Sequence, residues 1–239
     1  DPFLYTVALA ENAAANGAAF CFESEVTGIR RADDCFFVES AGNIYESRCL
    51  VNCAGVYSDR IAAMAGIQGY TIYPCRGEYI LLDKIADSLL DVPVYPTPNA
   101  GDGGLGIHLT PTVHGNVLLG PSAEYIGERD DVAATGEVFS QLLREARQLL
   151  PALDPSTVIG TFSGIRPKQA PPDEGGFWDF VLRDEPDCPG FLSLVGIESP
   201  GLTASLPIAR RVCSLLRERL PLVEKANFSP ARTGIVRFR

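Results

Sequence analysis

Two short apolar segments, one near each end of the chain, run into small residues and then into a helical pattern. Residues 49–55 read Cys-Leu-Val-Asn-Cys-Ala-Gly, and residues 191–196 read Phe-Leu-Ser-Leu-Val-Gly. An uninterrupted apolar run that ends in small residues is typical of a buried strand whose end faces a ligand. Because a helix pattern follows each strand, we expect a mixed α/β fold.

Hydrophobic periodicity predicts the remaining helices and strands. Apolar residues recur at helical spacing in some segments and form short runs or alternate between Gly, Pro and Asn in others. The predicted helices cover residues 4–16, 58–65, 137–150 and 201–216. The predicted strands cover residues 18–25, 26–30, 35–39, 44–46, 49–55, 77–82, 94–95, 106–109, 116–119, 158–162, 179–182 and 191–195.

The residue pattern changes at Tyr73, after which short strand-like runs alternate with Pro and Gly. This pattern is typical of an antiparallel sheet. We therefore expect one domain built from residues 1–70 and 190–239, with a second domain, residues 71–189, inserted between its two pieces.

The net charge of −10 limits the classes of partner that the protein can bind. Nucleic acids and anionic membranes need a basic surface, so we expect neither as a general partner. No apolar run approaches the ~20 residues that span a bilayer. A small anionic substrate remains compatible with this charge, because salt screens exposed carboxylates beyond about 8–10 Å and a local Arg or Lys dominates its own site.

The seven cysteines form no Cys-x-x-Cys pair, and their number is odd. This spacing favours free thiols in a reducing compartment over a disulfide framework or a zinc site. We therefore expect no metal in the site.

Residues 101–106 read Gly-Asp-Gly-Gly-Leu-Gly and match the G-x-G-x-x-G pattern of dinucleotide-binding loops. That pattern works only between a strand and a helix, whose N-terminus receives the pyrophosphate. Here Pro96 and Pro98 precede it, and a strand pattern containing Pro111 follows. We therefore interpret this segment as a surface loop.

The segment from Gly196 to Thr203 joins an apolar strand to an amphipathic helix. Small residues let the backbone approach a ligand, and the exposed N–H groups of a helix start favour negative charge. A ligand with an anionic edge suits this position, and an ordinary tight turn is the alternative. At Gly55, glycine either leaves room for a ligand across the strand end or serves close packing.

Arg166 lies between Ile165 and Pro167, at the end of a predicted strand. A rigid, forked donor of this kind suits a carboxylate, and Lys168 adds a second, point-like charge. A surface salt bridge is the alternative.

Two histidines are candidates for a proton acceptor near neutral pH. His108 lies in an apolar strand pattern and shares one face with Thr110, whereas His114 lies in a turn and is expected to be exposed. His108 is our candidate base, and a structural histidine is the alternative.

Five segments match a known family in order and spacing across nearly the whole chain. They are Tyr-Pro-Cys-Arg-Gly-Glu-Tyr at 73–79, Gly-Ile-His-Leu-Thr-Pro at 106–111, Leu-Leu-Gly-Pro at 118–121, Ser-Gly-Ile-Arg-Pro-Lys at 163–168 and Val-Gly-Ile-Glu-Ser-Pro-Gly-Leu-Thr at 195–203. Together they resemble the D-amino-acid oxidase superfamily of FAD-dependent oxidoreductases, and within it the L-2-hydroxyglutarate oxidases and dehydrogenases.

The resemblance implies FAD as cofactor, an incomplete Rossmann-like FAD-binding domain and an inserted antiparallel-sheet substrate domain. By that likeness Arg166 would bind a substrate carboxylate, and His108 would be the catalytic base. The residues implied to line the substrate pocket are Tyr79, Thr110, Arg166 and Lys168. The residues implied to contact FAD are Val26, Ala54, Gly55, Gly77, Gly164, Ile197, Ser199, Pro200, Gly201, Leu202 and Thr203.

The reaction implied by the resemblance is oxidation of a small 2-hydroxy acid, L-2-hydroxyglutarate to 2-oxoglutarate, by hydride transfer to flavin N5. The alternatives are an amine or glycerol 3-phosphate as substrate, or an inactive fragment without cofactor. Oxygen or a membrane quinone pool would accept the electrons, in a cytoplasmic or peripherally membrane-associated protein.

The glycine-rich strand–loop–helix start of this family is expected upstream of Asp1, which opens the chain inside a helical pattern. We therefore expect the chain to continue a longer sequence. Without that segment, the chain alone is expected to bind FAD weakly or not at all.

Overall fold

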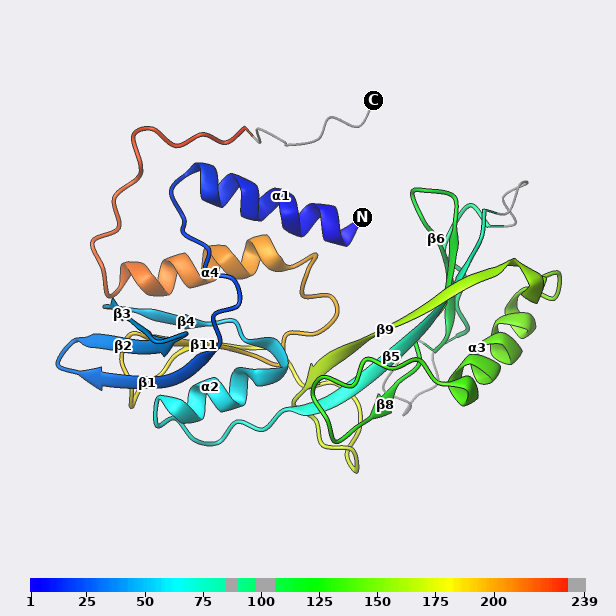
Figure 1. Ribbon diagram of the computed structural model, residues 1–239, viewed down its shortest axis with the longest axis horizontal. Coiled ribbons are helices and arrows are strands. Elements are labelled where there is room, and N and C mark those ends of the chain that lie inside the picture. Colours follow the sequence, from blue (N-terminus) through cyan, green and yellow to red (C-terminus); the bar gives the residue numbers. More distant parts are fainter. Residues whose placement is uncertain (85–89, 98–105, 232–239) are drawn as a thin grey trace.

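The computed structural model describes residues 1–84, 90–97 and 106–231, and these ranges contain both helices and strands (Figure 1). The mixed α/β class expected from the sequence is confirmed. The α-helices are α1 (Pro2–Ala15), α2 (Ser58–Met64), α3 (Gly136–Leu149) and α4 (Ser205–Arg217). The strands are β1 (Val26–Ala32), β2 (Cys35–Ser40), β3 (Asn43–Ser47), β4 (Leu50–Asn52), β5 (Tyr73–Leu82), β6 (His108–Pro111), β7 (Val117–Gly120), β8 (Glu124–Tyr125), β9 (Val158–Lys168), β10 (Val181–Asp184) and β11 (Phe191–Val195).

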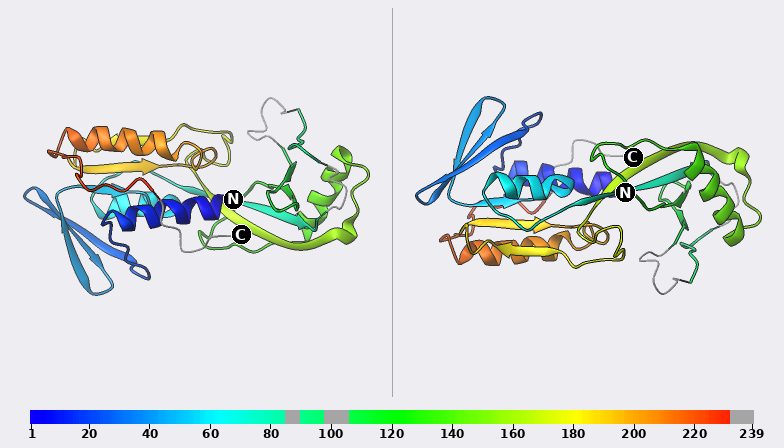
Figure 2. Two further views of the ribbon diagram at one scale, coloured as in Figure 1. Left: turned by 90° about the horizontal axis from the view of Figure 1, so that it is seen from above. Right: turned by 90° about the horizontal axis from the view of Figure 1, so that it is seen from below.

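Strands that lie far apart in the sequence, β4 on one side and β10 and β11 on the other, form one sheet with the order β10-β11-β4. β11 runs parallel to β4, with Leu192 opposite Val51, and antiparallel to β10. Every residue of β11 is buried, because α2 covers one face of this sheet and α4 the other (Figures 1 and 2). Both apolar strands expected from the sequence are present, and their carboxyl ends lie at the same edge.

β1, β2 and β3 form an antiparallel sheet that projects from the part of the molecule that contains the sheet β10-β11-β4 (Figure 2). The ring of Phe36 in β2 meets that of Phe191 in β11 edge-on, with ring centres 6.1 Å apart. Both side chains are fully buried, so this contact fixes the projecting sheet against the central one.

The middle of the chain forms an antiparallel sheet in which β5 has β7 and β8 on one side and β9 on the other. One face of this sheet packs against α3 through the buried Leu142. Ile80, Leu109 and Leu119 are fully buried beneath that helix. The antiparallel sheet expected from the sequence is therefore present.

Several predicted elements differ from the structure. Residues 18–25 form no strand: Phe20 and Phe22 are exposed, and no strand in the described part of the chain pairs with them, so the backbone has no ladder to join. The last helix begins at Ser205 and not at Gly201. Pro207 lacks an N–H and suits only the first turn of a helix, where donors have no intrahelical acceptor.

Strand β9 is longer than expected, because it runs to Lys168 instead of ending at Phe162. Arg166 therefore lies within a paired strand, opposite Cys75 of β5. Residues 101–105, which carry most of the G-x-G-x-x-G match, lie outside the described residues.

Three general features of the chain bear on its chemistry. Among the described residues, no helix has the length and apolarity to cross a bilayer. In the same ranges, no group of His, Cys, Asp and Glu side chains converges as metal ligands do. The seven cysteines are free thiols.

Candidate functional site

The paired strands β5 and β9 carry three of the four residues expected to line the substrate pocket, Tyr79, Arg166 and Lys168. Residues directly opposite one another in an antiparallel pair point to the same face, so Gly77 shares a face with Gly164, and Tyr79 with Phe162. Ile80, the next residue of β5, points to the other face, against α3. The candidate site therefore lies on the face of the sheet that α3 does not cover.

The guanidinium of Arg166 lies across β5, above Gly77, where an added Cβ would stand 2.4 Å from Nη2. Nη2 donates to the carbonyl oxygen of Ser122 at 2.9 Å, and Nη1 donates to Sγ of Cys75 at 3.7 Å. No carboxylate in the described part of the chain pairs with Arg166. The surface salt bridge is therefore absent there, and the remaining N–H groups suit a bound anion.

Beside Arg166, the rings of Tyr79 and Phe162 stack with their centres 5.1 Å apart. Burial raises the pKa of the Tyr79 hydroxyl, against the opposing effect of the Arg166 charge, so this group stays protonated and can donate a hydrogen bond. Phe162 is 46% exposed, and a Cβ on Gly164 would meet nothing within 4 Å. The surface at Gly164, between the stacked rings and the Arg166 guanidinium, is therefore open; we call it the floor of the site.

His108 and Thr110 of β6 lie on the same face of the sheet, since Leu109 between them is fully buried on the α3 side. Two strand spacings, about 10 Å, separate β6 from β5, so His108 stands across the face from the Arg166 guanidinium. Nδ1 of His108 lies 3.2 Å from the carbonyl oxygen of Gly106. In a hydrogen bond between these two atoms Nδ1 is the donor, since a carbonyl oxygen only accepts.

Lys168, at the end of β9, forms a buried ion pair with Glu198, with 3.2 Å between Nζ and Oε1. Nζ also donates to the carbonyl oxygen of Gly176 at 3.0 Å and lies 4.0 Å from the centre of the Phe177 ring. Oε2 of Glu198 is buried without a partner in the described part of the chain. The ammonium expected to face a substrate is therefore engaged with the loop between β11 and α4.

Two glycines shape the loop that joins β11 to α4. A Cβ on Gly196 would stand 2.2 Å from Nε2 of Gln169, so this glycine lets the end of β9 approach. A Cβ on Gly201 would stand 2.4 Å from Cγ2 of Ile197, which itself packs into the hydrophobic cluster with α4. The exposed residues of the loop are Ser199, Pro200, Leu202 and Thr203.

The edge where β4 and β11 end together fits the FAD expected from the sequence. Open α/β sheets bind ligands at the carboxyl ends of parallel strands. After β4, Ala54 is followed by Gly55, whose φ is +55° and where a Cβ would meet nothing within 4 Å. At the start of α4, Ser205 has a buried Oγ without a partner among the described residues. Val26 is half-buried and begins β1, which lies against α2.

Sequence reasoning missed three residues of this site: Phe162, Cys75 and Ser122. The alternation of Phe162, Gly164 and Arg166 along one strand could have found Phe162, because such residues share a face. The contact of Ser122 with Arg166 joins segments 44 residues apart, and no local pattern signals it.

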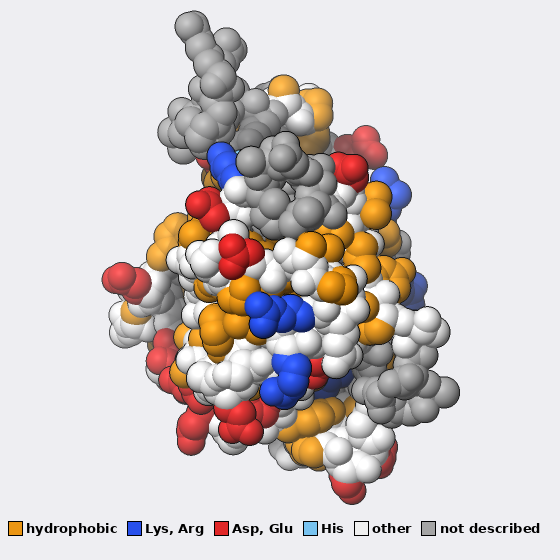
Figure 3. All heavy atoms as spheres, turned by 90° about the vertical axis from the view of Figure 1, so that its right-hand side faces the viewer, with side chains coloured by type: hydrophobic (Ala, Val, Ile, Leu, Met, Phe, Trp, Pro, Cys, Tyr) orange, Lys and Arg blue, Asp and Glu red, His pale blue; other side chains and the backbone are white. Residues whose placement is uncertain are grey.

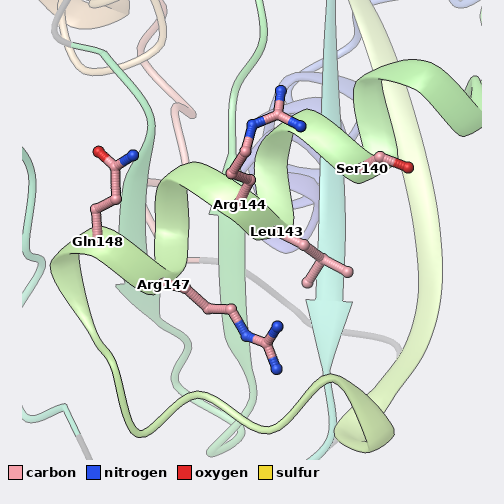
Figure 4. Close-up of a pocket in the computed structure, with 5 residues that line it drawn as sticks. All are labelled: Ser140, Leu143, Arg144, Arg147 and Gln148. Carbon is pink, nitrogen blue, oxygen red and sulfur yellow. The ribbon is translucent and has the colours of Figure 1, made fainter.

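A hollow of about 550 Å³ lies on the outer side of α3, at the end of the molecule seen in Figure 3. Basic side chains stand near the centre of this face, with hydrophobic ones around them (Figure 3). Because α3 covers the sheet face opposite to Tyr79, this hollow is separate from the candidate site. Its lining residues, drawn in Figure 4, are Ser140, Leu143, Arg144, Arg147 and Gln148.

Known proteins resemble the chain over most of its length. Residues 1–215 match the family described as FAD dependent oxidoreductase, DAO. Glycerol 3-phosphate dehydrogenase of Caloramator mitchellensis is 34% identical over 99% of this chain and 48% of that protein. Mitochondrial L-2-hydroxyglutarate dehydrogenase of Arabidopsis thaliana is 33% identical over 69% of this chain and 37% of that protein. The chain spans about half the length of the curated relatives it matches.

Solved structures share the fold. Dithionite-reduced L-alpha-glycerophosphate oxidase from Mycoplasma pneumoniae, with FAD bound, superposes with a TM-score of 0.82 at 27% identity, over 92% of this chain and 56% of that one. Glycine oxidase from Geobacillus kaustophilus, at 22% identity, gives 0.74 over 92% and 55% of the two chains and shows the fold alone. The chain therefore belongs to the DAO family of FAD-dependent oxidoreductases.

Proposed function

We propose that the protein oxidises a small hydroxy compound that carries an anionic group, with FAD as cofactor. One observation carries this proposal: in the described part of the chain, Arg166 has no ion-pair partner, and its guanidinium lies on the sheet face that α3 leaves open. A planar, forked donor binds a carboxylate or a phosphate through paired hydrogen bonds. A neutral alcohol would leave this charge uncompensated.

The other candidate residues take roles around the bound anion. Tyr79 and Thr110 line the pocket, and the Tyr79 hydroxyl, kept protonated by burial, donates a hydrogen bond to the substrate. His108 is the base: a backbone carbonyl holds its Nδ1 side, so Nε2 takes the proton of the substrate hydroxyl. Lys168, whose charge is balanced by Glu198, is proposed to border the pocket at the end of β9.

FAD supplies, when bound, the acceptor for the hydride that leaves the carbon bearing the hydroxyl group. We place its adenosine half by Val26, Ala54 and Gly55, where the parallel strands end. The residues proposed to lie by the rest of the cofactor are Gly77, Gly164, Ile197, Ser199, Pro200, Gly201, Leu202 and Thr203.

Two substrates of this class are the candidates, L-2-hydroxyglutarate and glycerol 3-phosphate. The resemblance that favours L-2-hydroxyglutarate rests partly on residues 73–79. Arg76 and Glu78 of that segment face away from the open side of the sheet, and Arg76 forms ion pairs with Glu78, Glu124 and Asp131. They therefore do not support one substrate over the other. The relative that matches 99% of the chain is a glycerol 3-phosphate dehydrogenase, which favours glycerol 3-phosphate.

A substrate panel on the FAD-loaded, full-length enzyme tests the proposal. We expect turnover of L-2-hydroxyglutarate or glycerol 3-phosphate, and none of glycerol or of a secondary amine. Arg166→Ala should lower kcat/KM about 100-fold, as expected when paired, charge-assisted hydrogen bonds are lost. Arg144→Ala, on the outer side of α3, is the matched control and should leave kcat/KM unchanged. Turnover of amines alone would refute the proposal.

We further propose that residues 1–70 and 190–239 form the FAD-binding part and residues 71–189 the substrate-binding part. The two parts share a sheet, because β10 of the substrate-binding part pairs with β11 of the FAD-binding part. Oxygen or a quinone is the proposed electron acceptor, and the proposed location is cytoplasmic or peripheral to a membrane.

A further inference from the structure

We propose that Ser122 is a positioning residue that holds Arg166 in the orientation needed to bind an anion; this inference rests on the proposed role of Arg166. Ser122 follows β7, and its carbonyl oxygen accepts from Nη2 of Arg166 at 2.9 Å. Among the described residues, the other hydrogen-bond partner of the guanidinium is Sγ of Cys75 at 3.7 Å, and a thiol sulfur is a weak acceptor. The carbonyl of Ser122 therefore sets the direction of the guanidinium fork.

Two hydrogen bonds to a single residue of β5 fix Ser122 in turn. Its N–H donates to the carbonyl oxygen of Glu78 at 3.1 Å, and its Oγ accepts from the N–H of Glu78 at 3.0 Å. Ser122 is 9% exposed and Glu78 2%, so water competes little for either bond. The Ser122 hydroxyl thus satisfies a buried backbone donor.

Glu78 is anchored on the opposite face of β5. Its carboxylate accepts from the N–H of Thr135 at 2.7 Å and from the Thr135 hydroxyl at 3.2 Å. It also lies 3.4 Å from Nε of Arg76. Thr135 is the N-cap of α3. A continuous chain of polar contacts therefore runs from the start of α3, through β5 and Ser122, to the guanidinium of Arg166.

Removal of the Ser122 hydroxyl breaks this chain at one point. Ser122→Ala leaves the N–H of Glu78 buried without its acceptor, so the backbone that carries the Ser122 carbonyl is less tightly held. The fork of Arg166 then populates more orientations before the anion binds. Ordering it on binding weakens affinity, whereas the chemistry of the bound substrate is unchanged.

The test measures KM and kcat of the FAD-loaded, full-length enzyme for whichever of L-2-hydroxyglutarate and glycerol 3-phosphate it turns over. Ser122→Ala should raise KM about five-fold and leave kcat within about two-fold. Ser122→Thr keeps the hydroxyl and should restore KM. Ser122→Cys keeps the size but has a weaker acceptor, and its intermediate KM serves as readout if the alanine variant folds poorly. Ser140→Ala removes an exposed hydroxyl on α3 and should change neither constant.

A double-mutant cycle separates positioning from a general structural effect. If Ser122 acts only through Arg166, Ser122→Ala adds no further rise in KM to an Arg166→Ala variant. An additive rise overturns the inference, and so does an unchanged KM in Ser122→Ala where Arg166→Ala raises it; both results leave the proposed function standing. An unchanged KM in Arg166→Ala overturns the proposed function and the inference together.

Discussion

Nη2 of Arg166 occupies the space that a side chain on Gly77 would fill, since an added Cβ would stand only 2.4 Å from it. Arg166 belongs to β9 and Gly77 to the neighbouring strand β5. One strand supplies the charge and the other supplies the room for it. The anion site is therefore a property of the strand pair and of its register.

Gly77→Ala should weaken anion binding without unfolding the protein. The clash involves the far end of a flexible side chain, so Arg166 moves aside at a cost of about 1 kcal/mol in the free energy of unfolding. We expect KM for the anionic substrate to rise about ten-fold, which corresponds to ~1.4 kcal/mol of lost binding. The control is Gly160→Ala on β9, where a Cβ meets nothing within 4 Å. Equal KM values for Gly77→Ala and the wild type would contradict the account.

A large side chain at position 164 should leave the stability of the fold unchanged but should impair catalysis. A Cβ there meets nothing within 4 Å, so the free energy of unfolding of Gly164→Leu should stay within about 0.5 kcal/mol of the wild type. The new side chain fills the floor between Phe162 and Arg166, and we expect kcat/KM to fall at least about ten-fold. Gly160→Leu, farther along the same face of β9, is the matched control. Full activity in Gly164→Leu would show that the substrate does not use this floor.

The ion pair between Asp59 and Arg129 makes part of the stability depend on pH. Nη2 of Arg129 lies 2.8 Å from Oδ2 of Asp59, and Nη1 contacts Oδ1, so the loop after β8 is tied to α2. Burial alone would raise the pKa of Asp59, but hydrogen bonds from Arg129 and from the N–H of Ile72 outweigh it and lower that pKa. The stabilisation is complete above the unfolded-state pKa, about 4, and is lost as pH falls through the lower folded-state value.

Asp59→Asn should therefore lower the free energy of unfolding by about 2 kcal/mol at pH 7. The difference from the wild type should shrink below about pH 4, where the wild type loses the same interaction. Urea denaturation at a series of pH values measures it, with the exposed Asp130→Asn as control. A difference that does not vary with pH would count against this ion pair as its source.

Removing one charge of the buried Lys168–Glu198 pair should cost more stability than removing both. Lys168→Met leaves the Glu198 carboxylate buried without its cation, at a cost of about 3 kcal/mol. The double variant Lys168→Met/Glu198→Gln leaves no buried charge and should recover at least about half of that loss. Chemical denaturation compares the two. A double variant as unstable as Lys168→Met would contradict the account.

The sequence predicts those elements whose pattern is complete in a short window. The strand expected at residues 191–195 is β11 with the same bounds, because an apolar run closed by Gly196 allows few other interpretations. The expected helix over 137–150 is α3 shifted by one residue, since its apolar stripe is regular. Arg166 and Tyr79 are likewise recognisable one at a time, from residue type and local motif.

Features that depend on contacts with distant segments cannot be predicted from short windows of the sequence. Beyond Phe162, β9 contains Gly164 and Pro167, which interrupt a strand pattern, yet pairing with β5 keeps it extended. The room that Gly77 leaves for Arg166 depends on strand register, which no local pattern fixes here. Lys168 resembles a ligand residue in sequence, and only the folded chain shows its ion pair with Glu198.

Anaerobic reduction of the flavin tests most directly whether Arg166 binds the anionic group of the substrate. The FAD-loaded, full-length enzyme is mixed with L-2-hydroxyglutarate or glycerol 3-phosphate, and the loss of visible flavin absorbance is followed over a range of concentrations. The wild type should be bleached by one of the two with saturable kinetics. Arg166→Met, which keeps the bulk without the charge, should need about 100-fold more substrate to reach half its maximal rate. The same half-saturating concentration in both proteins would contradict the central claim.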